Sequence, residues 1–104
     1  MADEWTEVAK TGDIAPGHCK AVVVDDRMIA VVNLDGEFYA IDNVCTHAFA
    51  ILSEGRIEGD LIQCPLHAAR FHIRTGEVAS PPAYEPLQTY EVTVRGGVIY
   101  LKIA

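Results

Sequence analysis

Hydrophobic and polar residues alternate with a period of two along most of this chain, which is the pattern of a half-buried β-strand. Five segments rich in β-branched and aromatic residues show it and are predicted to be strands: 21–24, 29–34, 37–41, 90–94 and 98–103. In the last of them, Ile99, Leu101 and Ile103 alternate with Tyr100 and Lys102. One face of this strand is therefore apolar and the other polar.

Pairs of turn-forming residues separate these segments at short intervals. Each pair lies where a hairpin can reverse the chain: Asp25-Asp26, Asp35-Gly36, Gly59-Asp60 and Gly96-Gly97. Residues 56–63 resemble a further hairpin, and residues 48–53 could form a single helical turn, but no segment carries a sustained apolar stripe with a period of 3.6. Many short strands at such spacing predict an all-β fold, a sandwich or a small barrel.

The length of 104 residues fits one domain, because domains cluster at roughly 100–150 residues. We therefore treat residues 1–104 as a single domain. Half of the residues are hydrophobic, yet no run approaches the ~20 apolar residues that cross a bilayer, and the first residues lack a basic and then apolar signal segment. We expect a cytoplasmic protein without membrane association, in which reducing conditions disfavour disulfides.

The chain is acidic, with 15 Asp and Glu against 8 Lys and Arg and a formal net charge of −7. The charges are spread without a block of one sign, so nucleic acid is not expected as a partner. An acidic body can raise the rate of encounter with a positively charged protein, or it can simply maintain solubility. The sequence leaves both interpretations open.

Two short motifs carry the candidate chemistry, Cys45-Thr46-His47 and Cys64-Pro65-Leu66-His67, with sixteen residues between them. Thiolates and imidazoles together suit an iron–sulfur cluster or zinc. Each motif holds one cysteine and one histidine, whereas a zinc finger usually has a cysteine pair followed by a histidine pair. Two loops that each offer one sulfur and one nitrogen can grip a two-iron, two-sulfide cluster from both sides, as in a Rieske site. A structural zinc domain remains the alternative.

Further residues around the two motifs carry a family resemblance. The motifs stand together with Leu52-Ser53-Glu54-Gly55, Gly59-Asp60, Phe71 and Arg74-Thr75-Gly76-Glu77. With these flanks, most of the chain resembles a Rieske-type ferredoxin of the bacterial ring-hydroxylating oxygenases. The resemblance implies an antiparallel β-sandwich or small barrel with an inserted cluster-binding subdomain of loops and short strands, at about residues 43–75.

The resemblance also implies one Rieske-type 2Fe-2S cluster as the cofactor. Cys45 and Cys64 would bind one iron, and His47 and His67 the other. The protein would be a one-electron carrier, not an enzyme, and a monomer. It would take electrons from a ferredoxin reductase and pass them to a terminal oxygenase of aromatic hydrocarbon catabolism. The small Rieske-like subunit of a nitrite reductase is a further alternative.

Residues next to the ligands predict the redox potential. Rieske proteins of high potential place hydroxyl groups two and four residues after the second histidine, where this chain has Ala69 and Phe71. Hydrogen bonds to the cluster sulfurs raise the potential, so their absence predicts a value at the low end, on the order of −150 mV. Two other positions depart from the family pattern, Ala68 in place of glycine and His72 in place of aspartate or asparagine.

Other residues near the ligands have open roles. Ala48, Phe49 and Pro65, with Arg70 at the rim, are predicted to form an apolar tip that docks onto redox partners, although core packing of Phe49 is as plausible. The proline-rich segment 80–86 is either a plain connector or, as the resemblance implies, a cover over the cluster. His18, Cys19 and His72 are interpreted as structural residues, not ligands.

Overall fold

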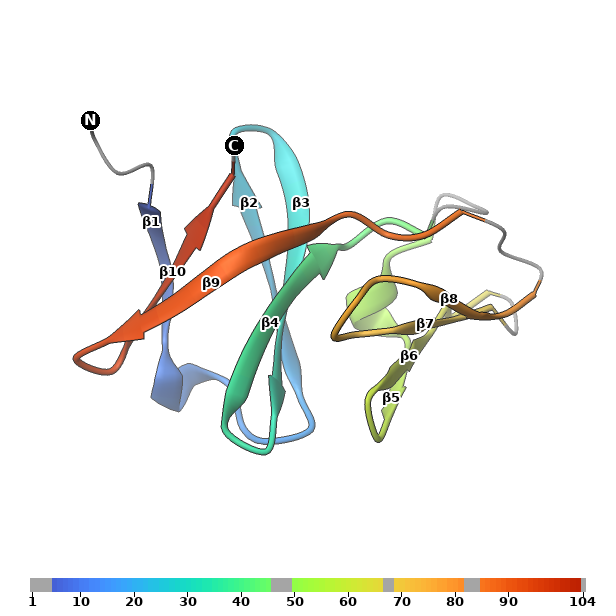
Figure 1. The fold of residues 1–104 in the computed structure, drawn as a ribbon, viewed down its shortest axis with the longest axis horizontal. Helices are drawn as coiled ribbons and strands as arrows, with labels where there is room; N and C mark the ends of the chain where they lie inside the picture. The colour runs from blue at the N-terminus through green and yellow to red at the C-terminus, as the bar shows by residue number, and fades with distance from the viewer. Residues whose placement is uncertain (1–4, 46–49, 67–68, 82–84, 104) are drawn as a thin grey trace.

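Two antiparallel sheets make up the described part of the chain (Figure 1). The structure is a computed structural model that describes residues 5–45, 50–66, 69–81 and 85–103. Its strands are β1 (Trp5–Lys10), β2 (Cys19–Val24), β3 (Arg27–Leu34), β4 (Glu37–Asp42), β5 (Arg56–Glu58), β6 (Leu61–Gln63), β7 (Arg70–His72), β8 (Val78–Ser80), β9 (Thr89–Arg95) and β10 (Val98–Lys102). Two short 3-10 turns accompany them, η1 (Thr11–Asp13) and η2 (Leu52–Glu54). The predicted all-β fold is confirmed.

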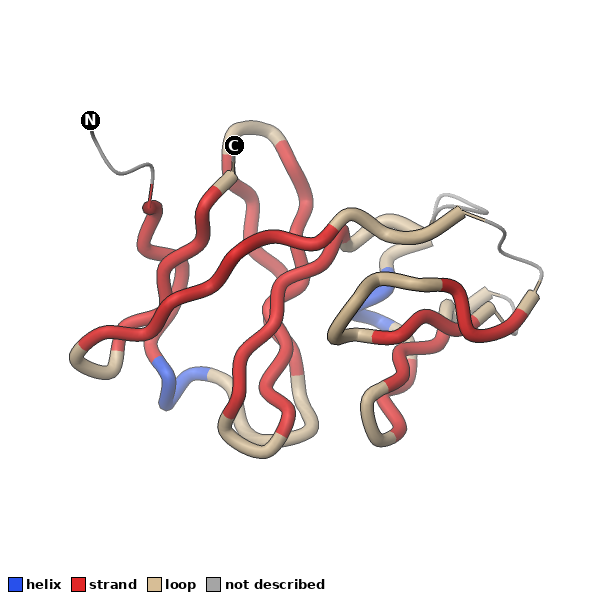
Figure 2. Tube along the Cα trace, viewed as in Figure 1, coloured by secondary structure: helices blue, strands red, loops and turns tan. Residues whose placement is uncertain are grey.

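The larger sheet has six strands in the order β1-β10-β9-β4-β3-β2 and curls into a nearly closed, barrel-like form (Figure 2). Its hairpins reverse where the turn pairs predicted. Asp25 and Asp26 adopt φ of 51° and 65° between β2 and β3, and Asp35 and Gly36 adopt φ of 54° and 93° between β3 and β4. Two successive residues with positive φ match the right-handed twist of the strands that they join.

One strand of this sheet was not predicted. β1 pairs antiparallel with β10, with a register shift between Glu7 and Ala9. Most of its residues are at least partly exposed, and Ala9 is its one buried residue. The sequence of β1, Trp-Thr-Glu-Val-Ala-Lys, neither alternates apolar and polar residues with a period of two nor forms a run of β-branched residues, so the signals used for the other strands did not identify it.

The second sheet lies between β4 and β9 along the chain and has the order β5-β6-β7-β8. The predicted hairpin over residues 56–63 is confirmed, because β5 and β6 pair from Arg56↔Gln63 to Glu58↔Leu61. Of the helical turn predicted over residues 48–53, the described part has Ile51 in a β-bridge and Leu52 and Ser53 in the 3-10 turn η2, which ends at Glu54. No helix among the described residues is long and apolar enough to cross a membrane. The 43–75 unit expected from the sequence stays a prediction.

The core divides into two clusters of buried side chains. One lies within the six-stranded sheet and includes Ile29, Val31, Ile99 and Leu101. The other joins the two sheets, because it combines residues of β3 and β4 with residues of β6 and β7. Its members are Ala30, Val32, Leu34, Ile41, Cys45, Ala50, Leu52, Ile62, Cys64, Ala69, Phe71, Ile73 and Leu87. Apolar burial therefore fixes the second sheet against the first.

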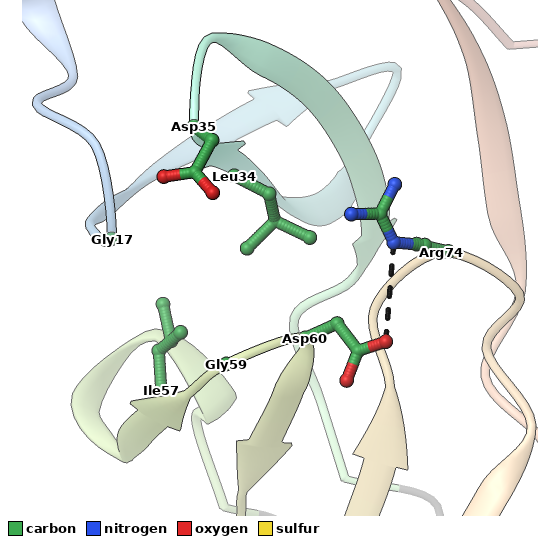
Figure 3. Close-up of a pocket in the computed structure, with 7 residues that line it drawn as sticks. All are labelled: Gly17, Leu34, Asp35, Ile57, Gly59, Asp60 and Arg74. Carbon is green, nitrogen blue, oxygen red and sulfur yellow. Dashed lines mark ion pairs between the residues drawn. The ribbon is translucent and has the colours of Figure 1, made fainter.

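Arg74 forms a polar connection at the edge of this contact. Its guanidinium group donates hydrogen bonds to Glu37, at 3.1 Å, and to the hydroxyl of Tyr39, both on β4. The same group lies 3.9 Å from the Asp60 carboxylate in the β5–β6 turn. Arg74 and Asp60 border a cavity of about 420 Å³, which Leu34 of β3, Asp35 of the following turn and Ile57 of β5 also line. Figure 3 shows these side chains around it. This cavity contains neither of the predicted cysteine ligands.

Close backbone contact at Gly76 predicts a steep loss of stability on substitution. Its φ is +78°, and an added Cβ would lie 2.3 Å from the Leu87 carbonyl oxygen. Gly59 has a similar φ of +60° but open space around it. Gly59→Ala should therefore cost only the positive-φ strain, roughly 1–2 kcal/mol. Gly76→Ala should cost about 1–3 kcal/mol more from overpacking. Urea unfolding compares the variants, and equal losses would contradict the assigned contact.

The contact of Arg74 with Glu37 predicts an acid-sensitive contribution to stability. Hydrogen bonds from Tyr39 and then Arg74 hold the pKa of Glu37 below its ordinary value of 4.5. A depressed pKa contributes stability above the unfolded-state pKa, and this stability is lost as pH falls through the folded-state value. Glu37→Gln should lower the urea midpoint at pH 7, with a difference from wild type that shrinks below pH 4.5.

Glu91→Gln is the matched control. Glu91 is an exposed carboxylate that lies 3.8 Å from Lys102, and this ion pair joins neighbouring strands of one sheet, whereas that of Glu37 joins the two sheets. It should change the midpoint less than Glu37→Gln does at pH 7. A Glu37→Gln difference that stayed constant down to pH 3 would contradict the proposed role of the carboxylate.

Candidate metal centre

The two predicted cysteine ligands follow strands of different sheets and meet in one core cluster. Cys45 comes three residues after β4, and Cys64 comes directly after β6. Their exposed fractions are 4% and 1%, and both belong to the buried cluster that joins the sheets. The other two predicted ligands, His47 and His67, lie outside the described residues. The structure thus buries both predicted cysteine ligands in the apolar cluster that joins the two sheets, and their role as ligands stays a prediction.

Both ligand motifs lie in loops that are closed in the same way. The Cys45 N–H donates to the Ala50 carbonyl oxygen at 3.0 Å, and the Cys64 N–H donates to the Ala69 carbonyl oxygen at 2.9 Å. In each case the hydrogen bond joins the cysteine to the fifth residue after it. The two cysteines of the repeated sequence motifs thus make the same backbone closure.

A close backbone approach holds the bases of the two loops together. Gly55 follows η2 on the far side of the first loop, and a Cβ there would lie 1.9 Å from the carbonyl oxygen of Gln63. Gln63 immediately precedes Cys64. Because Gly55 has φ of −88°, steric room and not backbone conformation makes glycine necessary here. The sequence contained Gly55 in the family pattern but gave no physical reason for it.

Asn43 is a buried polar residue near the site that sequence reasoning missed. Its exposed fraction is 0%, and it lies two residues before Cys45. Its side-chain oxygen accepts a hydrogen bond from the Ser53 N–H at 2.7 Å, and its amide nitrogen donates to the Ser53 hydroxyl at 2.9 Å. An asparagine at the end of a strand usually indicates a turn, so the sequence offered no signal for a role in the core.

The surface beside Cys64 is open and partly apolar. A cavity of about 490 Å³ is lined there by Glu54, Gly55, Arg56, Gln63, Cys64 and Pro65. Pro65 and Arg70 are exposed, and Leu66 is one of the most exposed large apolar side chains described, at 66%. Ala48 and Phe49, the other residues of the predicted docking tip, lie outside the described residues, as does part of the proline-rich segment 80–86.

The third cysteine and the two described histidines are not among the predicted ligands, and Cys19 packs against the cluster that contains Cys45 and Cys64. Cys19 is half-buried, its Sγ lies 3.8 Å from the Ser53 carbonyl oxygen, and burial raises the pKa of its thiol. His18 is exposed, and His72 is a half-buried residue of β7 whose backbone N–H donates to the Glu77 carbonyl oxygen. None of the three cysteines, all within the described ranges, forms a disulfide.

The donor set fits a metal cluster held by soft ligands. Thiolates are soft ligands that suit an iron–sulfur cluster or zinc, and two buried cysteines supply them here. Within the described ranges, no three side chains of His, Cys, Asp or Glu gather as they would around a metal ion. The predicted site needs His47 and His67 in addition to the two cysteines, and these histidines are outside those ranges.

Comparison with known proteins connects this geometry to ferredoxins. The chain is 40% identical over 93 residues to the biphenyl dioxygenase ferredoxin subunit of Pseudomonas sp. strain KKS102, with 88% of this chain and 85% of that protein covered. It also matches a chain in the solved complex of reduced oxygenase and oxidized ferredoxin of carbazole 1,9a-dioxygenase. That match has 38% identity and a TM-score of 0.91, and it covers 97% of this chain and 94% of the other.

A more distant structural relative bears on the nitrite reductase alternative. A structure assigned provisionally to the NADH-dependent nitrite reductase small subunit of Mycobacterium tuberculosis has 26% identity and a TM-score of 0.84, and the match covers 96% of both chains. Its identity is lower than that of the ferredoxins at similar coverage.

The family model of the Rieske [2Fe-2S] domain matches residues 4–91, which is most of the chain and includes both ligand motifs. This match favours the iron–sulfur cluster over the structural zinc domain. Two buried cysteines on similarly closed loops, in a chain that matches this model, lead to one conclusion: the protein belongs to the Rieske [2Fe-2S] family, and its cofactor is one Rieske-type 2Fe-2S cluster.

Proposed function

We propose that this protein is a one-electron carrier that takes electrons from a reductase and delivers them to the terminal oxygenase of an aromatic-ring dioxygenase system. The observation that supports this most is the burial of Cys45 and Cys64 in one apolar cluster, beside the exposed side chain of Leu66. The ferredoxin relatives are named as components of biphenyl and carbazole dioxygenases. A carrier needs a buried redox centre close to a docking surface, and it needs no substrate pocket.

The ligand set belongs to the proposal. Cys45 and Cys64 would bind one iron as thiolates, and His47 and His67 would bind the other as neutral imidazoles. When bound, the cluster supplies a single one-electron site whose potential lies above that of an all-cysteine cluster. The protein's own contribution is to keep water from the sulfur ligands, since the two cysteines are 4% and 1% exposed. The cytoplasmic location and the monomeric state expected from the sequence also belong to the proposal.

The exposed residues after Cys64 are suited to brief contact with a partner. Leu66 is 66% exposed, and Pro65 and Arg70 are exposed beside it. Electron-transfer encounters bury small areas, so a few apolar side chains with a polar rim are sufficient. Because these residues belong to the same loop as Cys64, or flank it, a protein docked there would lie close to the cluster.

Stopped-flow mixing of the reduced protein with an oxidised dioxygenase terminal component tests the function and the docking surface together. The wild-type protein should reduce the oxygenase. Leu66→Asp should slow this transfer by about tenfold, which corresponds to ~1.4 kcal/mol of lost encounter stability, while the visible spectrum stays unchanged. Val23→Asp is the control with the same added charge, because Val23 is 69% exposed on β2 of the larger sheet. No transfer by the wild type would refute the function; equal rates for both variants would refute the surface.

The buried ring of Phe71 predicts a low potential that one hydroxyl would raise. Phe71 is fully buried in the same cluster as Cys45 and Cys64, and a phenylalanine cannot donate a hydrogen bond toward sulfur. We expect a midpoint on the order of −150 mV, and Phe71→Tyr should shift it upward. Phe38→Tyr is the control, since Phe38 packs against the other core cluster. Potentiometric titration measures both, and a strongly positive wild-type midpoint would contradict the prediction.

A further inference from the structure

The two ligand loops differ in how they are supported. The Cys64 loop closes the β6–β7 hairpin, in which Ile62 pairs with Phe71 and Gln63 with Arg70, and both strands have a further neighbour in the sheet. The Cys45 loop stands on a much shorter base. The described residues give it the single bridge Val44↔Ile51, together with backbone hydrogen bonds at its two ends. The first loop therefore needs support from outside a regular sheet.

Asn43 supplies this support at the foot of the first loop. Its backbone carbonyl accepts from the Leu52 N–H at 2.8 Å, and its backbone N–H donates to the Met28 carbonyl oxygen at 2.9 Å on β3. Its carboxamide then bonds Ser53 twice, through the Ser53 N–H at 2.7 Å and the Ser53 hydroxyl at 2.9 Å. The Asn43 side chain thus adds a further cross-link, or rung, between the two segments of the loop base, and the Asn43 backbone is itself bonded to the larger sheet.

Burial makes this rung costly to lose. Asn43 has an exposed fraction of 0%, and removal of its amide would leave a gap at that position and the N–H of the half-buried Ser53 without its partner. Cys45 is only two residues further along the chain, and its own N–H bond to Ala50 is the next rung of the same base. If the base of the loop loosens, we therefore expect Cys45 to become displaced while the rest of the sheet keeps its structure.

We propose that Asn43 is a positioning residue for the metal centre. Its carboxamide oxygen and nitrogen both bond Ser53 across the base of the first loop. These bonds fix Cys45 in the buried cluster that it shares with Cys64. The inference rests on the proposed ligand set. Asn43 acts through the loop, and Ser53 is its partner in the same role. Residues that orient metal ligands typically change metal affinity by about 10–100-fold when they are substituted.

Asn33 provides a matched control for the general cost of removing a buried amide. It is the other buried polar residue described, with an exposed fraction of 4%. Its amide nitrogen donates to the Ile14 carbonyl oxygen at 2.8 Å, and its side-chain oxygen accepts from the Gly36 N–H at 2.7 Å. Both bonds lie in the larger sheet and its turns, so Asn33→Ala should lower stability without displacing a ligand loop.

The experiment uses the cluster-containing protein and compares wild type with Asn43→Ala, Ser53→Ala, Ser53→Thr and Asn33→Ala. Two readouts are followed well below the unfolding temperature: the g values of the reduced protein by electron paramagnetic resonance, and the rate at which an iron chelator bleaches the visible spectrum. Asn43→Ala should bleach about tenfold faster or more than wild type and have altered g values. Ser53→Ala should change both in the same direction, and Ser53→Thr, which keeps the hydroxyl, should restore wild-type behaviour. Asn33→Ala should keep wild-type g values and bleaching rate.

Asn43→Ala with wild-type g values and a bleaching rate no faster than that of Asn33→Ala would overturn the proposal. If Asn43→Ala does not fold, Ser53→Ala decides in its place, and wild-type behaviour of that variant overturns the proposal. A wild-type protein without a Rieske signal would instead refute the proposed function, so the two failures can be told apart.

Discussion

The structure depends on the burial of two thiols in one apolar cluster, although the loops that carry them follow strands of different sheets. Cys45 follows a strand of the six-stranded sheet and Cys64 follows a strand of the four-stranded sheet. The cluster of buried residues that contains them is also the one that joins the sheets. The position of one sheet on the other therefore sets how the two proposed sulfur ligands lie relative to each other.

Different interactions fix the position of the two sheets and the position of the Cys45 loop. Apolar packing supplies most of the contact, and the Gly55 backbone against Gln63 brings the loop bases within a distance that no side chain would allow. Arg74, in the turn after β7, adds polar contacts to Glu37 and to the half-buried Tyr39, but the ion pair with Glu37 is exposed to solvent and contributes less. Apolar packing thus orients the two sheets, and the hydrogen bonds of Asn43 orient the Cys45 loop.

Sequence reasoning found the features that local chemistry determines. Turn pairs such as Asp25-Asp26 have a strong local preference, and the strands with clear alternation followed from burial of one face. It did not find β1, because the sequence of this strand has neither a period-two alternation nor a run of β-branched residues. It also missed the role of Asn43, since the bonds of this residue to Ser53 join positions ten residues apart and depend on how the loop folds. The histidine half of the site, His47 and His67, rests on the sequence motifs and the family match.

Electron paramagnetic resonance of the dithionite-reduced protein tests the central claim most directly, because the signal depends on which atoms bind each iron. If sulfur ligands from Cys45 and Cys64 hold one iron and nitrogen ligands hold the other, the reduced protein gives a rhombic signal whose average g value lies below that of all-cysteine clusters. An average g value typical of four cysteine ligands, or no signal from protein purified without air, would contradict the account.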